Sequence, residues 1–494
     1  MNNNGDRNRN REREDDGLWW KIPLGIGAAA AVIGGIVAAV VSSSNDSAPD
    51  TGQSMQYRRR SRRPSTPDSS PDRSSNISYN FGALEISDER IIPQGIRSGP
   101  VINNLDSLLA DIYMRFISLK DDALYYRVFH SISSTIRRNM EEVDPYFKRY
   151  SSTAQIAGSH YDNLRIRLPD PEDEFDMDIV IDLPLNMRKD RLNPSNSDIV
   201  LEPSSNGYIQ LKMGTQYQNL PNRDEWHVNK TAYGWRDDEF FLSRAKFSDW
   251  FKSITYKALN KLEKYYNYRS IEVAGTKYII RTSESGPAIT LKISDPVTDF
   301  KMSIDIVPAL RFPEERWPVR SDYRDIPPGC SVGDYGWMVV PKPASSGESS
   351  RSWRLALHNQ ERKLFYGTYN LRQTVRYLKK LRDAEGMNEI ASYYIKTLFF
   401  WEVIQQKSDE RFWNQPLSKL FIIMVKKFQQ ALANRNIPYF WNKNHNLIDG
   451  VAPNVVAGYA NKLKKLVVIL DDPTRYKEVA KYLLTIDEYN SYDI

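Results

Sequence analysis

Three acidic residues at alternating positions mark the part of this sequence most suited to chemistry. Glu174, Asp176 and Asp178 lie in the segment EFDMDIVIDL, which alternates acidic and apolar residues before it becomes apolar throughout. Alternate residues of a β-strand point to the same face, so the three carboxylates would project together. Acids crowded on one face repel each other unless a cation lies among them, and oxygen ligands favour Mg²⁺ or Mn²⁺. The spacing therefore predicts a half-buried strand that carries a divalent-metal site.

A further carboxylate and a Gly-Ser pair could complete such a site. Asp305 lies within MSIDIVPAL, where a charge inside an otherwise apolar strand is costly without a partner. Two metal ions bridged by carboxylates can activate an attacking hydroxyl and stabilise a leaving pyrophosphate. Gly158 would let the backbone approach a phosphate closely, and Ser159 would add a hydroxyl to the exposed N–H groups. From spacing alone, a solvated strand face with a salt-bridged Asp305 is the alternative to a catalytic centre.

The elements around these residues indicate a mixed α+β lobe followed by a helical lobe. Residues 104–149 and 239–265 repeat apolar residues at helical steps, and the β-rich runs are 271–282, 287–294 and 300–308. After Trp353 we expect helices in the segments RLALHNQERKLF, LRQTVRYLKKLRDA, NEIASYYIKTLFFWEVIQ and LSKLFIIMVKKFQQALANR.

The first eighty or so residues differ in composition from the rest. Residues 1–17 form a polar tail of low complexity, and residues 43–80 are rich in Ser, Pro, Asp and Arg, as in disordered linkers. Between them, residues 18–42 contain an uncharged apolar run at 22–41, long enough to span a lipid bilayer as a helix. We expect a single-pass transmembrane helix over 18–42; a cleaved signal peptide and a buried core helix are the alternatives.

The composition excludes several classes of protein. The 494-residue chain carries 68 Lys and Arg against 62 Asp and Glu, a net charge of +6, and one cysteine, Cys330. One cysteine excludes an internal disulfide framework and a zinc site built on several cysteines. Hydrophobic residues at 40% and aromatic residues at 12% exclude a wholly disordered protein.

The segment GSHYDNLRIRLPDPEDEFDMDIVIDLP resembles the nucleotide-binding signature of the cyclic GMP-AMP synthase and male-abnormal-21 nucleotidyltransferases. SGPAITLKI and MSIDIVPAL resemble later core strands of that family, SWRLALHNQERKLF the start of its helical lobe, and NEIASYYIKTLFFW its base-stacking helix. The resemblance covers about residues 100–460 in the order of the family. It implies a bilobal nucleotidyltransferase fold, with a core lobe at 81–350 and a helical C-terminal lobe at 351–494.

The resemblance also implies roles for individual residues. Glu174, Asp176 and Asp305 would be the catalytic metal ligands, Asp305 would orient or deprotonate the attacking ribose hydroxyl, and Asp178 could replace one of the first pair. The nucleotide-binding residues would be Gly158, Ser159, Arg354, Glu361, Arg376, Ser392, Tyr393 and Lys396. Arg354 would contact a guanine or phosphate and Tyr393 would stack on a base; the alternatives are a surface ion pair for Arg354 and core packing for Tyr393.

The activator would be a nucleic acid on this interpretation. The loop between Glu361 and Arg376 contains no Cys or His, so it lacks the zinc-binding thumb of the vertebrate synthase. The chain looks more like the insect cyclic GMP-AMP synthase-like receptors, which respond to double-stranded RNA. A stripe of lysines on one helix could bind phosphate backbones, or form an ordinary solvated face; the lysines are Lys252, Lys257, Lys261 and Lys264.

The leading hypothesis is therefore an innate immune sensor that joins ATP and GTP into a cyclic dinucleotide such as cyclic GMP-AMP. Double-stranded RNA, or DNA in second place, would activate it, with the catalytic domain anchored to a membrane and facing the cytosol. The replacement of two small polar residues of the synthase by Ala356 and His358 leaves the choice of acceptor nucleotide open. The alternatives are a membrane-anchored, non-catalytic nucleotide-binding adaptor of the same fold and a developmental regulator of the male-abnormal-21 type.

Overall fold

The computed structural model describes residues 101–119, 123–167, 173–185, 187, 198–204, 207–317, 322–343, 350–406 and 409–493, which fall within one compact unit. The expected polar tail (1–17), transmembrane helix (18–42) and linker (43–80) lie outside the described residues. Over the part of the chain that is described, no helix combines the length and the apolar character needed to cross a bilayer.

Eleven strands of the described chain form one mixed sheet, in the order β3-β4-β11-β10-β9-β8-β7-β6-β5, with β2 joined to β9 and β1 to β2. The strands of this sheet are β1 (Ser151–Ala157), β2 (Asp173–Ile181), β3 (Ile199–Pro203), β4 (Tyr208–Met213), β5 (Lys264–Tyr265), β6 (Tyr268–Val273), β7 (Thr276–Ser285), β8 (Ala288–Ser294), β9 (Lys301–Phe312), β10 (Trp337–Val340) and β11 (Ser352–Ala356). A separate two-stranded sheet pairs β12 (Pro438–Tyr439) with β13 (Asn442–Asn446).

Strand β9 is the axis of the large sheet. One edge of β9 pairs in parallel with β2, from Met302 to Leu310, while the other edge pairs antiparallel first with β8 and then with β10. Because successive side chains of a strand alternate between faces, β2 presents Phe175 and Met177 to the main hydrophobic core and its acids to the opposite face. The strand expected at 174–183 is therefore present, with the expected alternation.

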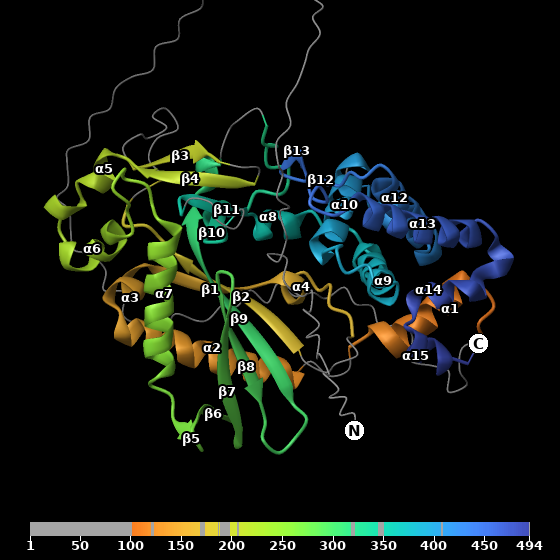
Figure 1. Cartoon of the computed structure of the whole chain (residues 1–494), viewed down its shortest axis with the longest axis horizontal. Coiled ribbons are helices and arrows are strands. Elements are labelled where there is room, and N and C mark those ends of the chain that lie inside the picture. The colour runs from red at the N-terminus through yellow and green to blue at the C-terminus, as the bar shows by residue number, and fades with distance from the viewer. Residues whose placement is uncertain are drawn as a thin grey trace, which may run out of the picture. The chain divides into compact units, whose positions relative to one another are not determined.

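Helices cover the core face of the sheet and build a separate helical region (Figure 1). Those that pack near the sheet are α2 (Ala123–Val143), α3 (Pro145–Tyr150), α4 (Gly158–Tyr161), α5 (Thr215–Gln218), α6 (Trp226–Gly234), α7 (Arg244–Leu259) and α8 (His358–Lys363). The remaining helices are α1 (Leu105–Ile112), α9 (Leu371–Ala384), α10 (Ser392–Gln405), α11 (Glu410–Trp413), α12 (Leu417–Ala433), α13 (Pro453–Leu470), α14 (Ala480–Leu483) and α15 (Ile486–Asn490).

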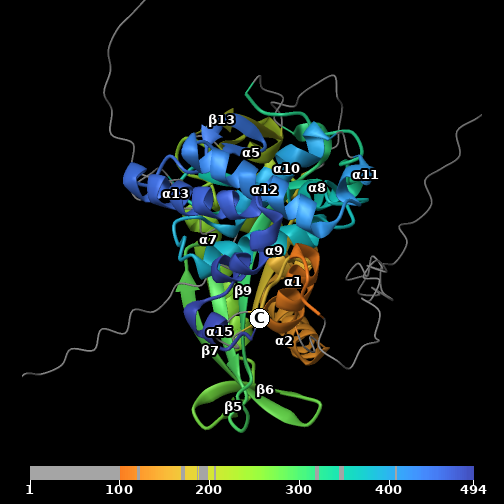
Figure 2. The same ribbon diagram turned by 90° about the vertical axis from the view of Figure 1, so that its right-hand side faces the viewer.

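The C-terminal helical region packs against α1, the first described helix of the chain. Helix α1 packs against α12 and α14, and the Tyr492 hydroxyl donates to Asp111 Oδ2 at 2.6 Å. Figure 1 places α4 between the sheet and α9, and Figure 2 shows the β5–β6 end of the sheet projecting away from the helical region. The mixed α+β architecture followed by a helical C-terminal region agrees with the sequence-based expectation.

The start of one expected helix was wrong. The segment RLALHNQERKLF does not form one helix: Arg354, Leu355 and Ala356 belong to β11, and α8 begins at His358. The segment SWRLA alternates polar and apolar residues as far as Leu355, but this alternation is short and runs directly into the helical pattern of α8. The β-rich run expected at 271–282 is confirmed and consists of parts of two strands, because the chain turns at Gly275 (φ +83°) between β6 and β7.

Removal of the Phe129 ring should weaken the packing of α2 on β2. Phe129 is fully buried and its ring stacks on Phe175 with centroids 4.6 Å apart, so Phe129→Ala should lower the free energy of unfolding by about 3–5 kcal/mol. Urea denaturation followed by fluorescence measures this loss. Tyr266 is 79% exposed, and Tyr266→Ala is the control expected to change stability by less than about 0.5 kcal/mol. Equal losses in the two variants would contradict the packing.

Candidate active site

Two acidic residues far apart in the sequence are neighbours in the centre of the sheet. The parallel register of β2 and β9 sets Asp176 directly beside Asp305, and both side chains are buried, 3% and 1% exposed. The Thr290 hydroxyl on β8 donates a hydrogen bond of 2.5 Å to Asp305 Oδ1. Glu174 precedes Asp176 by two residues on the same face of β2 and is half-buried. The structure thus brings the three expected carboxylates to one face of two adjacent strands.

Asp178 continues this row but has a different partner. His358, the first residue of α8, places its Nε2 3.0 Å from Asp178 Oδ2, and both side chains are buried. The contact joins the N-terminus of α8 to strand β2. Asp178 was the alternative metal ligand in the sequence, and here its carboxylate binds a histidine instead.

Gly158 is required by a close approach of the backbone to Asp176. Its φ is +65°, and a Cβ added there would lie 1.8 Å from Asp176 Oδ2, closer than any side chain could be accommodated. The next residue, Ser159, lies in the first turn of α4, whose following residue His160 stacks on Phe175 with ring centroids 3.6 Å apart. This stacking holds the Gly-Ser turn against β2, so Ser159 lies close to the acidic row.

The helical side of the site is a buried network around Glu361. The Glu361 carboxylate accepts hydrogen bonds from the Tyr393 hydroxyl at 2.7 Å, the Trp441 indole at 3.0 Å and Lys396 Nζ at 3.2 Å. Lys396 also lies 2.5 Å from Asp162, in the loop after α4. Burial alone would lower the pKa of Lys396, but the Asp162 and Glu361 carboxylates raise it above its usual value. Burial and the Glu361 charge likewise raise the pKa of Tyr393 well above the usual range.

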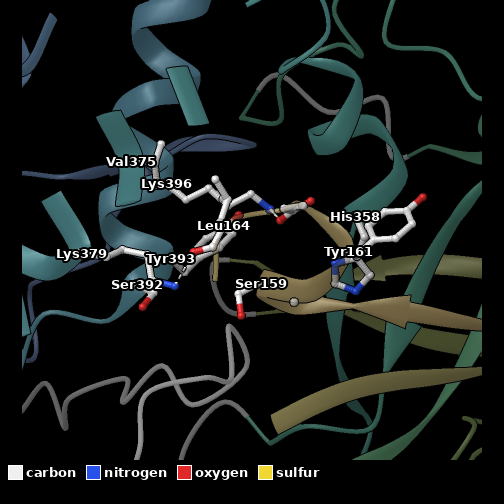
Figure 3. A pocket seen from close by; sticks show the side chains of 11 residues that line it. Ser159, Tyr161, Leu164, His358, Val375, Lys379, Ser392, Tyr393 and Lys396 are labelled. Carbon is white, nitrogen blue, oxygen red and sulfur yellow. Dashed lines mark hydrogen bonds and ion pairs between the residues drawn. The ribbon is translucent and has the colours of Figure 1, made fainter. Parts of the chain in front are cut away.

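A pocket that is open to solvent lies between these two sides (Figure 3). Figure 3 shows Ser159 facing Ser392 and Tyr393 across it. Of the expected nucleotide-binding residues, the pocket wall contains Gly158, Ser159, Ser392, Tyr393 and Lys396. Five lining residues were missed in the sequence: Tyr161, Asp162, Leu164, Val375 and Lys379; His358, also in the wall, was noted there only for its bearing on the acceptor nucleotide. Lys379 lies one helical turn beyond Arg376, and helical spacing was the only signal that could have indicated it.

Arg354 and Arg376 occupy buried positions outside the wall of this pocket. The guanidinium carbon of Arg354 lies 5.2 Å from the ring centroid of Tyr208 and 5.1 Å from that of Tyr439. Burial alone would lower its pKa, but these tyrosines keep the pKa of Arg354 above its usual value. Arg354 is 3% exposed, so the alternative of a surface ion pair was wrong.

Arg376 holds the loop that follows α4 rather than facing the pocket. Its Nη2 donates to the Asn163 carbonyl at 3.0 Å and to the Asn163 side chain, and its Nη1 donates to the Tyr113 hydroxyl. Asn163 has a positive φ of 55°, a conformation that favours Asn among the residues with side chains. Arg376 therefore positions this loop from the helical side.

The expectation that four lysines form a stripe on one helix was wrong. Helix α7 ends at Leu259, so Lys261 lies in the following turn and Lys264 in strand β5. Lys252 on α7 pairs with Glu284 at 2.6 Å, and Lys261 pairs with Glu142. The spacing of five, four and three residues allowed one continuous helix, but the chain turns at Asn260 to start the β5–β6 hairpin.

The carboxylates of Glu174, Asp176 and Asp305 meet part of what a hard divalent cation requires of its ligands. Among the described residues, no group of three or more His, Cys, Asp or Glu side chains lies close enough together to hold a metal ion. The donor set is nevertheless suitable, because Asp176 and Asp305 present carboxylate oxygens side by side on adjacent strands. Mg²⁺ is commonly held by one or two carboxylates, with waters and substrate phosphates as its other ligands. The ligand in the pocket would fill the remaining coordination positions of a cation bound here.

Substitution of Gly158 should separate the effect of backbone strain from that of the close approach to Asp176. In Gly158→Ala the new methyl group would have to displace the Asp176 side chain, whereas Gly275→Ala has the same kind of positive φ and nothing within 4 Å. Strain alone should cost Gly275→Ala about 1–2 kcal/mol. Gly158→Ala should lose about 1–3 kcal/mol more from overpacking, measured by chemical denaturation. Equal losses would contradict the close approach.

Comparison with known proteins agrees with this geometry. Residues 160–367 match the model of the Mab-21 protein nucleotidyltransferase domain, and residues 370–465 match that of the Mab-21 protein HhH/H2TH-like domain. Proteins named cyclic GMP-AMP synthase-like receptor from Aethina tumida and Tribolium castaneum are each 31% identical to this chain, over 78% of its length and 93% and 94% of theirs. One from Ctenocephalides felis is 30% identical, over 78% of this chain and 89% of its own. The chain therefore belongs to the Mab-21 nucleotidyltransferase family, with a nucleotidyltransferase domain and the C-terminal domain that follows it.

Proposed function

We propose that this nucleotidyltransferase is an innate immune sensor that makes a cyclic dinucleotide, such as cyclic GMP-AMP, from ATP and GTP when it binds a nucleic acid. The observation that carries the proposal is the pairing of Asp176 with Asp305 beside the Gly158-Ser159 turn, at a pocket that has lysines on its other side. The names of the relatives support the class of product. Family resemblance supports double-stranded RNA as the activator, with DNA in second place.

Each side of the pocket has a task in such a reaction. A ribose hydroxyl of one nucleotide attacks the α-phosphorus of the other, the new O–P bond forms, and the bond to pyrophosphate breaks. Asp305, fixed by the Thr290 hydroxyl, orients the attacking hydroxyl and accepts its proton. The Ser159 hydroxyl and the backbone N–H groups at the start of α4 bind phosphate oxygens. Tyr393 and Glu361 hold the nucleoside from the helical side.

A divalent cation, Mg²⁺ or Mn²⁺, would be held by Asp176 and Asp305, whose strands are paired; Glu174, the third expected ligand, lies on the same face of β2. When bound, it would supply charge neutralisation for the triphosphate and for the leaving pyrophosphate. The chain's own contribution is the rigid placement of the carboxylates, because Asp176 and Asp305 are fixed by the register of two paired strands rather than by a loop.

A membrane-anchored, non-catalytic adaptor that binds nucleotide is the second proposal. The uncharged run at 22–41, which lies outside the described residues, supports an anchor that holds the folded region at a membrane on its cytosolic side. The buried carboxylate pair supports the enzyme, because an adaptor gains nothing from burying two acids side by side. We therefore place catalysis first.

Replacement of Asp305 should abolish the product and leave the fold intact. Asp305→Asn keeps the shape of the side chain and its acceptor for Thr290, but it removes the charge and the proton acceptor, so product should fall by at least about 100-fold. The full-length chain is incubated with ATP, GTP and Mg²⁺ or Mn²⁺, with or without double-stranded RNA, and products are identified by mass. Asp299→Asn, on the exposed loop before β9, is the matched control. Turnover by Asp305→Asn would refute the mechanism; nucleotide binding without any product in the wild type would favour the adaptor.

The activator surface should include the β5–β6 hairpin. A hollow there is lined by Asn260, Lys264, Asn267, Tyr268, Arg269, Ile280 and Arg281, and no carboxylate of the described chain forms an ion pair with its three cationic residues. The double variant Lys264→Glu, Arg281→Glu should weaken RNA binding and lower the slope of log K against log salt by about 1 for each lost phosphate contact. Lys464→Glu with Lys465→Glu, exposed on α13, makes the same charge change elsewhere. Equal effects of the two pairs would exclude a role specific to the hairpin.

A further inference from the structure

The end of the chain, residues 485–492, makes buried polar contacts with helices α9 and α1. Lys380 Nζ on α9 donates to both carboxylate oxygens of Glu488 on α15, at 2.6 and 2.7 Å. Lys380 is 2% exposed, so Glu488 neutralises a charge whose burial would otherwise be costly. Four residues further on, the Tyr492 hydroxyl donates to Asp111 on α1, and both side chains are buried. These contacts fix a terminus of a kind that is poorly ordered when nothing holds it. We call residues 485–492 the C-terminal strap.

The Tyr492 contact extends to the π-helical turn η1 (Tyr113–Ile117), which continues α1. The Tyr492 ring meets the Phe116 ring edge-on with centroids 5.6 Å apart, and the guanidinium carbon of Arg115 lies 5.3 Å from the Tyr492 centroid. Burial and the Asp111 carboxylate raise the pKa of Tyr492 well above its usual value, so its hydroxyl keeps the proton that it donates. The strap therefore holds both α1 and the turn in which it ends, and such turns are frequent at functional sites.

The same turn is joined to α9, and α9 to the loop after α4. The Tyr377 hydroxyl on α9 donates to the Leu109 carbonyl of α1 at 2.7 Å, and the rings of Tyr377 and Tyr113 have centroids 6.0 Å apart. The Tyr113 hydroxyl accepts a hydrogen bond from Arg376, which also binds Asn163 in the loop. The strap, α1 with η1, and α9 therefore contact one another in pairs (Figure 1).

The elements held in this way carry part of the pocket wall. Helix α9 contributes Val375 and Lys379, and the loop held by Arg376 contributes Asp162 and Leu164. Because a protein interior is close-packed and transmits strain, a shift of α9 would move these groups together. Misplacement of binding groups by about 1 Å can lower a rate by about 100-fold. The position of α9 therefore bears directly on what the pocket can do.

We infer that the C-terminal strap sets the position of α9 and of the loop after α4, with Glu488 and Tyr492 as positioning residues for the nucleotide pocket. The inference rests on the proposed nucleotidyl transfer for the identity of the ligand, but it concerns the shape of the pocket before a ligand binds. Lys380 and Asp111, the partners of these two residues, do not line the pocket. The effect of the strap on a nucleotide therefore passes through α9 and α1.

Two conservative substitutions remove the contacts of the strap and keep its local structure. Glu488→Gln removes the charge that meets Lys380, and a glutamine can still close the capping box with Thr485 at the start of α15. Tyr492→Phe removes the hydroxyl and keeps the ring against Phe116. Neither change touches the carboxylates, the Gly-Ser turn or the pocket wall, so both leave the reacting groups themselves unaltered.

The test follows amide hydrogen exchange of the full-length chain without ligand, and then measures binding of an ATP analogue with a non-cleavable α,β-methylene bridge by calorimetry. Each strap variant should speed exchange on α9 and in the loop 161–164, and weaken binding, by about 10- to 100-fold, the loss of one hydrogen bond to a charged group. Exchange on β2 and β9 should not change. Glu478→Gln, which breaks an exposed ion pair with Arg475, and Tyr489→Phe are the controls, expected to match the wild type.

A double-mutant cycle tests the ion pair itself. Lys380→Met and Glu488→Gln each remove the same interaction, so their combined effect on exchange of α9 should differ clearly from the sum of the single effects. Additive effects would contradict a direct action of Glu488 through Lys380.

Several outcomes would overturn the inference. Faster exchange confined to α1 and α15, with unchanged binding, would do so, and so would equal effects in the control variants. Faster exchange on β2 and β9 as well would indicate a general loss of stability and would also contradict positioning. The proposed reaction has a separate readout. A wild type that makes no dinucleotide, or binds no nucleotide, refutes that reaction, while exchange of the ligand-free variants still decides whether the strap positions α9 and the loop.

Discussion

The cost of burying acidic side chains in the middle of an apolar sheet governs the arrangement of this protein. Asp176 and Asp305 lie side by side on β2 and β9, almost without exposure to water. Loss of hydration destabilises each charge, and the two like charges repel each other. Burial of this pair therefore lowers the stability of the sheet. The residues around the pair make interactions that offset part of this loss.

That compensation comes from both sides of the pocket. On the sheet side, Thr290 donates to Asp305, and the absence of a side chain at Gly158 lets the start of α4 lie against Asp176. On the helical side, α9 and α10 bring Lys379 and Lys396 to the opposite wall. A polyanion with its cation would satisfy both walls together, because its negative charge meets the lysines and its metal ion meets the carboxylates. The arrangement is suited to a nucleoside triphosphate for this electrostatic reason.

Part of the fold could be predicted because it is encoded in local periodicity. Strand β2 alternates acidic and apolar residues, and α9 extends from Leu371 to Ala384 as its pattern indicated. Strand β11 was not recognised in this way, because its alternation of polar and apolar residues ends at Leu355 and runs directly into the helical pattern of α8. The same limit applies to the site. A helical pattern places Arg376 and Lys379 on α9, but the side that faces the pocket is set by how α9 rotates against its neighbours.

By itself the sequence determined the chemistry available to this protein: a row of acids on one strand, an acid in a second strand, a Gly-Ser pair and the family resemblance that joins them. The tertiary structure alone decided which of these residues act together. The register of β2 on β9 pairs Asp176 with Asp305, α8 brings His358 to Asp178, and packing of α9 turns Lys379 rather than Arg376 into the pocket. Local periodicity cannot specify these choices, because strand register and helix rotation are fixed by the burial of apolar surface between segments far apart in the chain.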